Sequence, residues 1–343
     1  MTELEFAWVL PSTGDGEHIG TWMPEREPTL ELLTRTARTC DEAGYRTILV
    51  TVGAVNNHFG PDAPYVDPFV AAAAIVPATE RLRPLVALRS GTMLPATAAR
   101  MCSTLDVLSG GRLSVNAVSG GRTLTMYGEH DEHAERYART DEQLTVLRGL
   151  WTEERFSFRG RFYSAEDAIM APKPLQRPHP PIYFAGQSPP AREVGARHAD
   201  CMLLPGTTPE RAAEYAADMR RRAAEAGRSL RVGTHFYIVA RSTESEALEA
   251  AEALLARLDP RLERGQAGGN ERVAPGLWLG MRRLWGEASL TLIGSYEQVA
   301  GALRSFVDAG ITTFILTGFP MEAEAARVAE HVMPLVEPAA LRG

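Results

Sequence analysis

The sequence predicts one closed α/β barrel of eight parallel strands, a (β/α)8 or TIM barrel with insertions. Short apolar runs alternate along the chain with longer amphipathic segments. Such runs are typical of strands that are buried on both faces of a parallel sheet. Eight β-then-α units favour a closed barrel. The alternative is an open doubly wound sheet, but no G-x-G-x-x-G follows the first strand.

Two of the predicted helices have clear boundaries. In residues 95–109, apolar side chains recur at spacings of four and three, Pro95 stands in the first turn, and Gly110 follows the end. Residues 296–308 show the same apolar spacing and end before an Ala-Gly pair. The eight predicted strands cover residues 6–10, 47–52, 85–89, 113–119, 182–185, 201–204, 232–240 and 313–317.

Composition limits the class of protein. The chain has 343 residues, 45% hydrophobic and 23% charged, which suits a single globular domain over residues 1–343. A net charge of −7 argues against a nucleic-acid partner. No apolar run is long enough to span a membrane, and the acidic start lacks the basic region of a signal peptide. We therefore expect a cytoplasmic protein that binds neither nucleic acid nor membrane.

The three cysteines are far apart and odd in number, and no metal-ligand spacing occurs. They predict neither a disulfide framework nor a metal site. Buried free thiols are the expectation.

Three segments are longer than ordinary barrel loops: 54–66, 151–181 and 259–290. The second contains an aromatic alternation around Arg-Gly, at 156–163, that predicts a small hairpin. Active sites of such barrels lie on the loops that follow the strands. The first and third segments are therefore expected to flank the active-site mouth.

Candidate anion-binding residues follow the fourth and fifth predicted strands. Ser188 precedes Pro189 at a strand-to-helix turn, where a helix N-terminus and a hydroxyl suit a phosphate. Simple helix capping is the common alternative, and Pro189 has no N–H to offer. Arg136 and Tyr137, at the start of a helix, have side chains that can also bind a phosphate. The alternative is an ordinary ion pair at the start of the helix.

Asn116 interrupts an apolar strand near its carboxyl end. An amide can donate and accept, which suits a planar heterocycle such as flavin, although backbone groups can satisfy it equally well.

Possible proton-transfer residues lie on the seventh strand and after the second. His235 and Tyr237 are two apart and so share one face of a strand, toward either the barrel interior or the outer helices. A His beside a Tyr can transfer protons. His58 and Asn56 lie in the segment after the second strand, where the Asn pair also suits a turn.

The late segment supplies Arg283 and Trp285. These two side chains suit an anionic substrate, or else belong to a helix with a buried Trp.

Seven stretches resemble the FMN-dependent alkanesulfonate monooxygenase branch of the bacterial luciferase-like superfamily. The similarity runs over most of the chain, and the middle part is also similar to dimethylsulfone and pyrimidine monooxygenases. The stretches are PSTGDG (11–16), TLDVLSGGR (104–112), SVNAVSGG (114–121), HAERY (133–137), APKPLQRPHPPIYFAGQS (171–188), LIGS (292–295) and ILTGFP (315–320).

This resemblance implies a homodimeric or homotetrameric barrel that uses FMN as FMNH2, supplied by a separate NAD(P)H-dependent flavin reductase. By position, Val52 and Gly53 would lie along the isoalloxazine ring and Asn116 would contact its polar edge. Tyr137, with Arg136 beside it, and Ser188 would hold the ribityl phosphate.

The same resemblance shows differences at the substrate side. Where the branch has Cys, Trp, Arg, His, Arg, Tyr and His, this chain has Asn56, Pro205, His235, Tyr237, Trp285, Phe319 and Met321, with Arg283 two residues from Trp285. These differences argue against simple alkanesulfonate desulfonation.

The sequence thus predicts a two-component FMNH2-dependent monooxygenase that uses O2 on a small organic substrate, with a sulfonate, a sulfone or a heterocycle as candidates. We expect His235, Tyr237, His58 and Asn56 to be catalytic, and Arg283, Trp285 and Phe319 to bind substrate. An F420-dependent oxidoreductase of the same superfamily and a non-catalytic flavin-binding accessory barrel are the alternatives.

Overall fold

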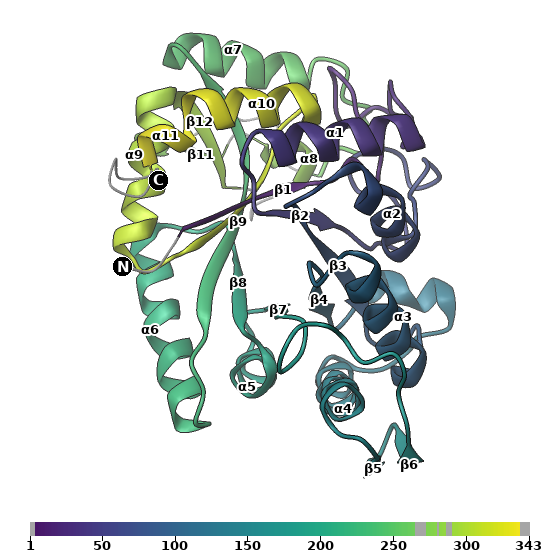
Figure 1. Cartoon of the computed structure of the whole chain (residues 1–343). Helices are drawn as coiled ribbons and strands as arrows, with labels where there is room; N and C mark the ends of the chain where they lie inside the picture. Colours follow the sequence, from purple (N-terminus) through teal and green to yellow (C-terminus); the bar gives the residue numbers. More distant parts are fainter. Residues whose placement is uncertain (1–3, 265–271, 280, 286–289, 337–343) are drawn as a thin grey trace.

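The computed structural model shows a closed barrel of eight parallel strands, as predicted (Figure 1). The structure describes residues 4–264, 272–279, 281–285 and 290–336. Pairing of β8 with β9, in register from Cys201 with Arg231, closes the ring. In sequence order the barrel strands are β1 (Glu5–Val9), β2 (Thr47–Val50), β3 (Arg83–Arg89), β4 (Ser114–Val118), β7 (Ile182–Ala185), β8 (Cys201–Pro205), β9 (Arg231–Arg241) and β13 (Thr313–Thr317).

Helices surround this barrel (Figure 1). Both helices singled out from the sequence are confirmed, and each begins and ends within a residue of its predicted range. The helices are α1 (Leu30–Glu42), α2 (Pro68–Ile75), α3 (Pro95–Leu108), α4 (His133–Thr152), α5 (Pro189–His198), α6 (Pro209–Glu225), α7 (Glu244–Leu254), α8 (Arg282–Trp285), α9 (Tyr296–Asp308), α10 (Met321–His331) and α11 (Met333–Val336), with short 3-10 turns at Val76–Ala78 and Arg122–Tyr127.

Additional strands lie in the long segments. The predicted hairpin is confirmed as β5 (Phe156–Arg159) paired with β6 (Ser164–Ala168). A strand that we did not predict, β12 (Thr291–Ser295), pairs with the distal half of β9 and continues the sheet through β11 (Leu277–Trp278) to β10 (Arg272–Ala274). Because β9 is 11 residues long, its first half pairs with β8 and β13 and its last residues pair with β12.

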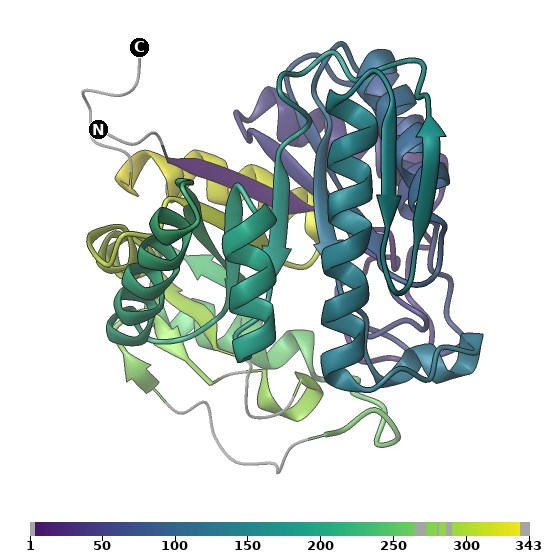
Figure 2. The same ribbon diagram turned by 90° about the horizontal axis from the view of Figure 1, so that it is seen from below.

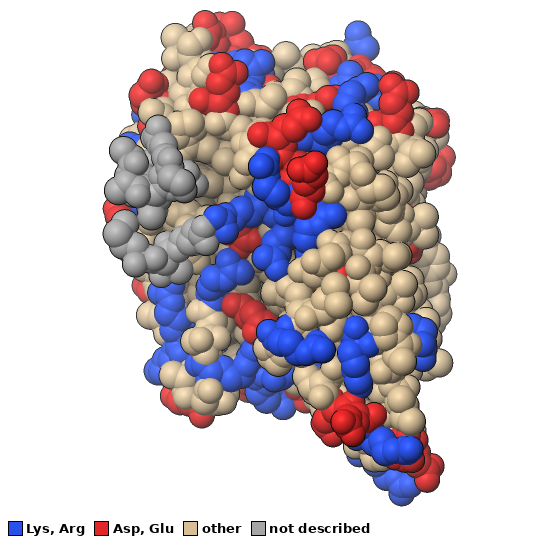
Figure 3. Space-filling model, in the orientation of Figure 1, with Lys and Arg blue, Asp and Glu red and all other residues tan. Residues whose placement is uncertain are grey.

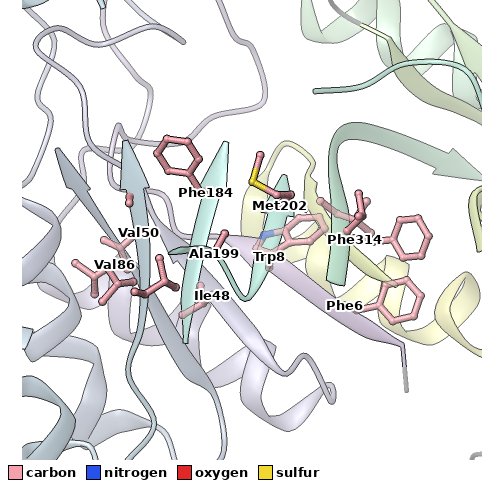
Figure 4. Close-up of a cluster of buried hydrophobic side chains, with 14 of the residues drawn as sticks. Phe6, Trp8, Ile48, Val50, Val86, Phe184, Ala199, Met202 and Phe314 are labelled. Carbon is pink, nitrogen blue, oxygen red and sulfur yellow. The ribbon is translucent and has the colours of Figure 1, made fainter. Parts of the chain in front are cut away.

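Two layers of apolar side chains hold the barrel. On β1, Phe6 and Trp8 belong to the large cluster between strands and helices, whereas Ala7 and Val9 fill the interior. Figure 4 shows part of the outer layer, with Phe6 beside Phe314. The alternation follows from the two-residue period of a strand. The cysteines are free and buried, which raises the pKa of the Cys201 thiol to about 12.

The two ends of the barrel differ. The strands begin at one end, where β1 starts, and α8 lies at the other (Figure 2). The first end has a cavity of about 580 Å³ whose lining includes Glu5, Arg83 and Arg231. Arg and Lys side chains gather across the middle of this face (Figure 3). The polar side chains of the candidate active site belong to the opposite end.

Within the described ranges, no helix has the length and apolarity needed to cross a membrane. Nor do three or more His, Cys, Asp or Glu side chains in these ranges form a cluster suited to a metal ion.

Candidate active site

The carboxyl ends of the barrel strands bring polar side chains together. His235 pairs in register with Ile315, and Tyr237 with Thr317, so β9 and β13 present their side chains side by side. Ile315 fills the barrel interior, and the side chain of His235 lies close to those of Tyr237 and Thr317. The sequence left open whether His235 and Tyr237 face the barrel or its helices, and the structure places both on the barrel side.

A chain of hydrogen bonds connects the segment after β2 to β9. The Nδ1 atom of His58 lies 3.0 Å from Thr13 Oγ1, and its Nε2 atom lies 2.9 Å from the Tyr237 hydroxyl. The His235 ring stands 5.2 Å from the Tyr237 ring, and its Nε2 atom is 2.9 Å from Thr317 Oγ1. Thus both imidazoles lie beside a single phenol, and the hydroxyl of this phenol is within hydrogen-bond distance of His58, the geometry required for proton exchange between that pair.

Asn56 holds the backbone around His58 in place. Its Nδ2 atom donates to the carbonyls of Thr13 and Pro64, at 2.8 and 2.9 Å, and its Oδ1 atom accepts from the backbone N–H groups of His58 and Phe59, both at 3.0 Å. All these bonds fix the loop. The structure therefore gives the Asn56 side chain the geometry of a positioning residue for His58.

These groups are uncharged at neutral pH. Burial lowers the pKa of His58 to about 3, with the neighbouring His235 acting in the same direction, and burial lowers the pKa of His235 to about 4. Burial also raises the pKa of the Tyr237 phenol. Phe319 is buried with its ring 5.3 Å from that of His58. This side of the mouth is therefore aromatic, neutral and able to exchange hydrogen-bonded protons.

The neutral imidazoles lead to a pH prediction. Unfolded histidine takes up a proton near the ordinary value of 6.5, whereas folded His235 does so only near 4. The unfolded chain therefore binds more protons as pH falls through this window, and the folded state loses stability. We expect the melting temperature to fall between pH 6.5 and 4.5 less steeply in His235→Gln than in the unsubstituted protein. Equal slopes in scanning calorimetry would contradict the assignment.

At the part of the barrel mouth next to β4, three buried polar atoms have no hydrogen-bond partner among the described residues. Asn116 Oδ1, Arg136 Nε and Ser188 Oγ are all inaccessible to solvent and accept or donate no hydrogen bond among the described residues. Ser188 stands at the N-cap of α5 but its side chain does not cap the helix, and the first two helical residues, Pro189 and Pro190, provide no N–H. Buried polar groups are normally paired, so these three atoms are candidates to bind a polar ligand.

Tyr137 completes this side. It is buried, with its ring against those of Phe184 and His133. A Cβ atom on Gly186 would come within 3.3 Å of the Tyr137 hydroxyl, which places this hydroxyl beside the turn that leads to Ser188. With φ at +155°, Gly186 also has a backbone that other residues rarely adopt. Two hydroxyls and a bare backbone turn can together hold a phosphate.

Val52 and Gly53 lie between these two sides. A Cβ atom on Gly53 would meet the Tyr65 ring at 2.2 Å, so only glycine fits against this ring. The Val52 carbonyl accepts a hydrogen bond of 3.0 Å from Arg89. Both residues are partly exposed.

The late-segment residues are less clearly connected to the site. Arg283 is partly exposed and its Nε atom donates to Glu263 at 2.8 Å. Trp285 ends α8, and its side chain lies outside the described residues. The predicted substrate roles of both stay predictions.

Comparison with known proteins identifies the family. A family model described as luciferase-like monooxygenase matches residues 4–313. The chain belongs to the luciferase-like monooxygenase family.

Solved structures agree on the luciferase-like fold. EDTA monooxygenase from Chelativorans sp. BNC1 is 21% identical, with a TM-score of 0.80 over 98% of this chain and 93% of that one. A long-chain alkane monooxygenase is 22% identical, with a TM-score of 0.80 over 97% and 91%. An F420-dependent secondary alcohol dehydrogenase is 15% identical, with a TM-score of 0.72 over 98% and 100%.

Three residues of the candidate site were missed in the sequence. Thr13 lies within the PSTGDG stretch, so its motif was noticed while its bond to His58 was not. Thr317 ends an apolar strand, where Thr is an ordinary strand residue. Arg89 ends β3 and was assigned to the strand alone. A polar side chain at the carboxyl end of a barrel strand was the available signal.

Proposed function

We propose that this luciferase-like protein is a two-component FMNH2-dependent monooxygenase that oxygenates a small, uncharged organic substrate. The observation that carries the proposal is the set of buried, unpartnered polar atoms. Asn116 Oδ1, Arg136 Nε and Ser188 Oγ occur at positions that the family resemblance assigns to flavin. Folding leaves these atoms unsatisfied at a cost that a bound FMN would offset.

The residues fit the parts of FMN. Ser188 and Tyr137, with Arg136 near them, would bind the ribityl phosphate, whose negative charge suits the start of α5. Asn116 would accept from or donate to the polar edge of the ring, and the backbone at Val52 and Gly53 would lie along it. When bound, reduced flavin supplies the electrons that activate O2, and the protein orients substrate and excludes water.

The neutral aromatic side of the mouth would bind the substrate. Phe319 provides an apolar wall, while His235 and the Tyr237 hydroxyl can donate to a substrate oxygen or nitrogen. The Tyr237 hydroxyl then exchanges its proton with His58 Nε2, and Thr13 fixes the other ring nitrogen. Since no cation stands among His58, His235, Tyr237 and Phe319, the site favours a sulfone or a heterocycle over a sulfonate.

The proposal includes partners. A separate NAD(P)H-dependent flavin reductase would supply FMNH2, and the barrel would form a homodimer or homotetramer in the cytoplasm. The buried free thiols suit a reducing compartment.

Binding of reduced flavin tests this function. We expect the purified protein to bind FMNH2 in an anaerobic titration, and Ser188→Ala to weaken that binding about tenfold, because one charge-assisted hydrogen bond to phosphate is lost. A matched control is Ser245→Ala, on the exposed start of α7. After oxygen is admitted, candidate sulfones and heterocycles should change the rate of flavin reoxidation.

Each other outcome has a meaning. Binding of reduced F420 in place of FMNH2 would favour the hydride-transfer alternative. Binding of FMNH2 with no substrate-dependent oxygen consumption across a broad screen would favour the accessory barrel. If the protein binds neither FMNH2 nor reduced F420, the proposal is contradicted.

A further inference from the structure

Arg89, the last residue of β3, is a buried cation with few partners. The residue is only 9% exposed. Its Nη2 atom donates to the Val52 carbonyl at 3.0 Å, and its Nε atom is buried without a partner. No carboxylate among the described residues forms an ion pair with it.

Two carboxylates on the segment between β4 and α4, Glu129 and Asp131, are already engaged. Arg139 forms ion pairs with Glu129 and with Asp131, the latter at 2.9 Å. The two side chains whose ionisation would act on Arg89 are the phenols of Tyr65 and Tyr127. Burial raises the pKa of the Tyr65 phenol, so that phenol does not supply the missing negative charge. The Tyr65 hydroxyl in turn donates to Thr51 Oγ1 at 2.9 Å. A buried guanidinium surrounded by neutral groups is costly unless an anion joins it.

Arg89 lies between the residues that flank the proposed flavin ring. On β3 it is two residues after Ala87, which pairs in register with Asn116. Side chains two apart on a strand share a face, so Arg89 and Asn116 lie on the same side of the sheet, one step apart toward the mouth. The hydrogen bond to Val52 holds the guanidinium beside the end of β2.

Reduced and oxidised flavin differ in charge at one edge. Near neutral pH the reduced ring loses the proton on N1 and becomes anionic at N1 and the C2 carbonyl, whereas the oxidised ring is neutral. The phosphate carries the same charge in both forms. A buried cation at the pyrimidine edge therefore distinguishes the two forms, while residues at the phosphate do not.

We propose that Arg89 binds the anionic pyrimidine edge of reduced flavin and so makes the site select FMNH2 over FMN. This inference rests on the proposed function and deepens it. A protein that receives its flavin from a separate reductase needs such selectivity, because both forms are present in the cell. Arg89 would provide it through a charge-assisted hydrogen bond in a site of low polarity.

Arg89→Met tests the inference by binding rather than turnover. We expect its affinity for FMNH2 at pH 7.5 to fall about 10- to 100-fold, the range for a lost hydrogen bond to a charged group, with FMN affinity within about threefold of the parent. Arg89→Lys should keep part of the preference. Arg100→Met, at an exposed position of α3, is the control and should change neither affinity.

Folding and function are separable in this experiment. Removing an unpaired buried charge should leave the melting temperature of Arg89→Met unchanged or raised. Unchanged FMNH2 affinity would overturn the inference, and so would an equal loss for FMN and FMNH2. If the parent protein binds no FMNH2, the proposed function fails as well, whereas a preference that survives in Arg89→Met overturns the role of Arg89 alone.

Discussion

Replacing Tyr237 with Phe should lower oxygenation turnover about 100-fold or more, the lower end of the range for losing a positioned proton-transfer group. The hydroxyl is the atom through which His58 Nε2 reaches the mouth, at 2.9 Å. Phe keeps the ring beside those of His58 and His235, at 6.0 and 5.2 Å, so packing should change little. Steady-state oxygen consumption with a substrate found by reoxidation screening measures the effect.

Companion variants separate chemistry from structure. Tyr237→Phe should bind FMNH2 within about twofold of the parent, because the flavin positions lie on other strands. His58→Gln should lose turnover similarly, and the double variant should lose little more, since residues that act as a unit are not additive. Tyr296→Phe, whose ring stacks on His331 on the outer helices, is the matched control. Full turnover by Tyr237→Phe would remove the phenol from the mechanism.

Most of the barrel could be predicted from the sequence because its strands are buried on both faces. Such strands appear as short apolar runs, and all eight barrel strands match these runs. Strand β12 could not be predicted from the sequence, because it pairs with the distal half of β9. The length over which two strands pair depends on the tertiary structure. Local pattern shows that a segment can be a strand but not which neighbour it joins.

The site shows the same division. The two-residue period placed His235 and Tyr237 on one face, and their rings lie 5.2 Å apart. Their link to His58 depends on how the segment after β2 folds, which Asn56 fixes through backbone atoms that no sequence pattern shows. Arg89 was missed for another reason. A charged residue that ends an apolar run ordinarily reaches solvent, and its burial becomes visible only once the barrel closes.

At the opposite end of the barrel, a buried carboxylate joins β1 to four other strands. Glu5 on β1 accepts hydrogen bonds from the hydroxyls of Thr47, Tyr183 and Thr313, at 2.5, 2.8 and 2.9 Å. Arg231 Nη1 donates to it at 2.6 Å. Burial alone would raise the pKa of Glu5, but Arg231 and these hydrogen bonds lower it below its ordinary value. The ionised form therefore stabilises the fold above the ordinary pKa of a glutamate, and this contribution is lost as pH falls.

Glu5→Ala should accordingly lower the free energy of unfolding by about 3 kcal/mol, the lower end of the range for breaking a buried ion pair. The lower end applies because the Arg231 side chain is 35% exposed to the cavity at this end. Urea denaturation at pH 7.5 measures the loss. Adding Arg231→Met to Glu5→Ala should recover part of it, since the stranded guanidinium is removed with its partner. If Glu5→Ala costs less than about 1 kcal/mol, or if the second substitution adds its own full cost, the pair does not act as a buried electrostatic unit.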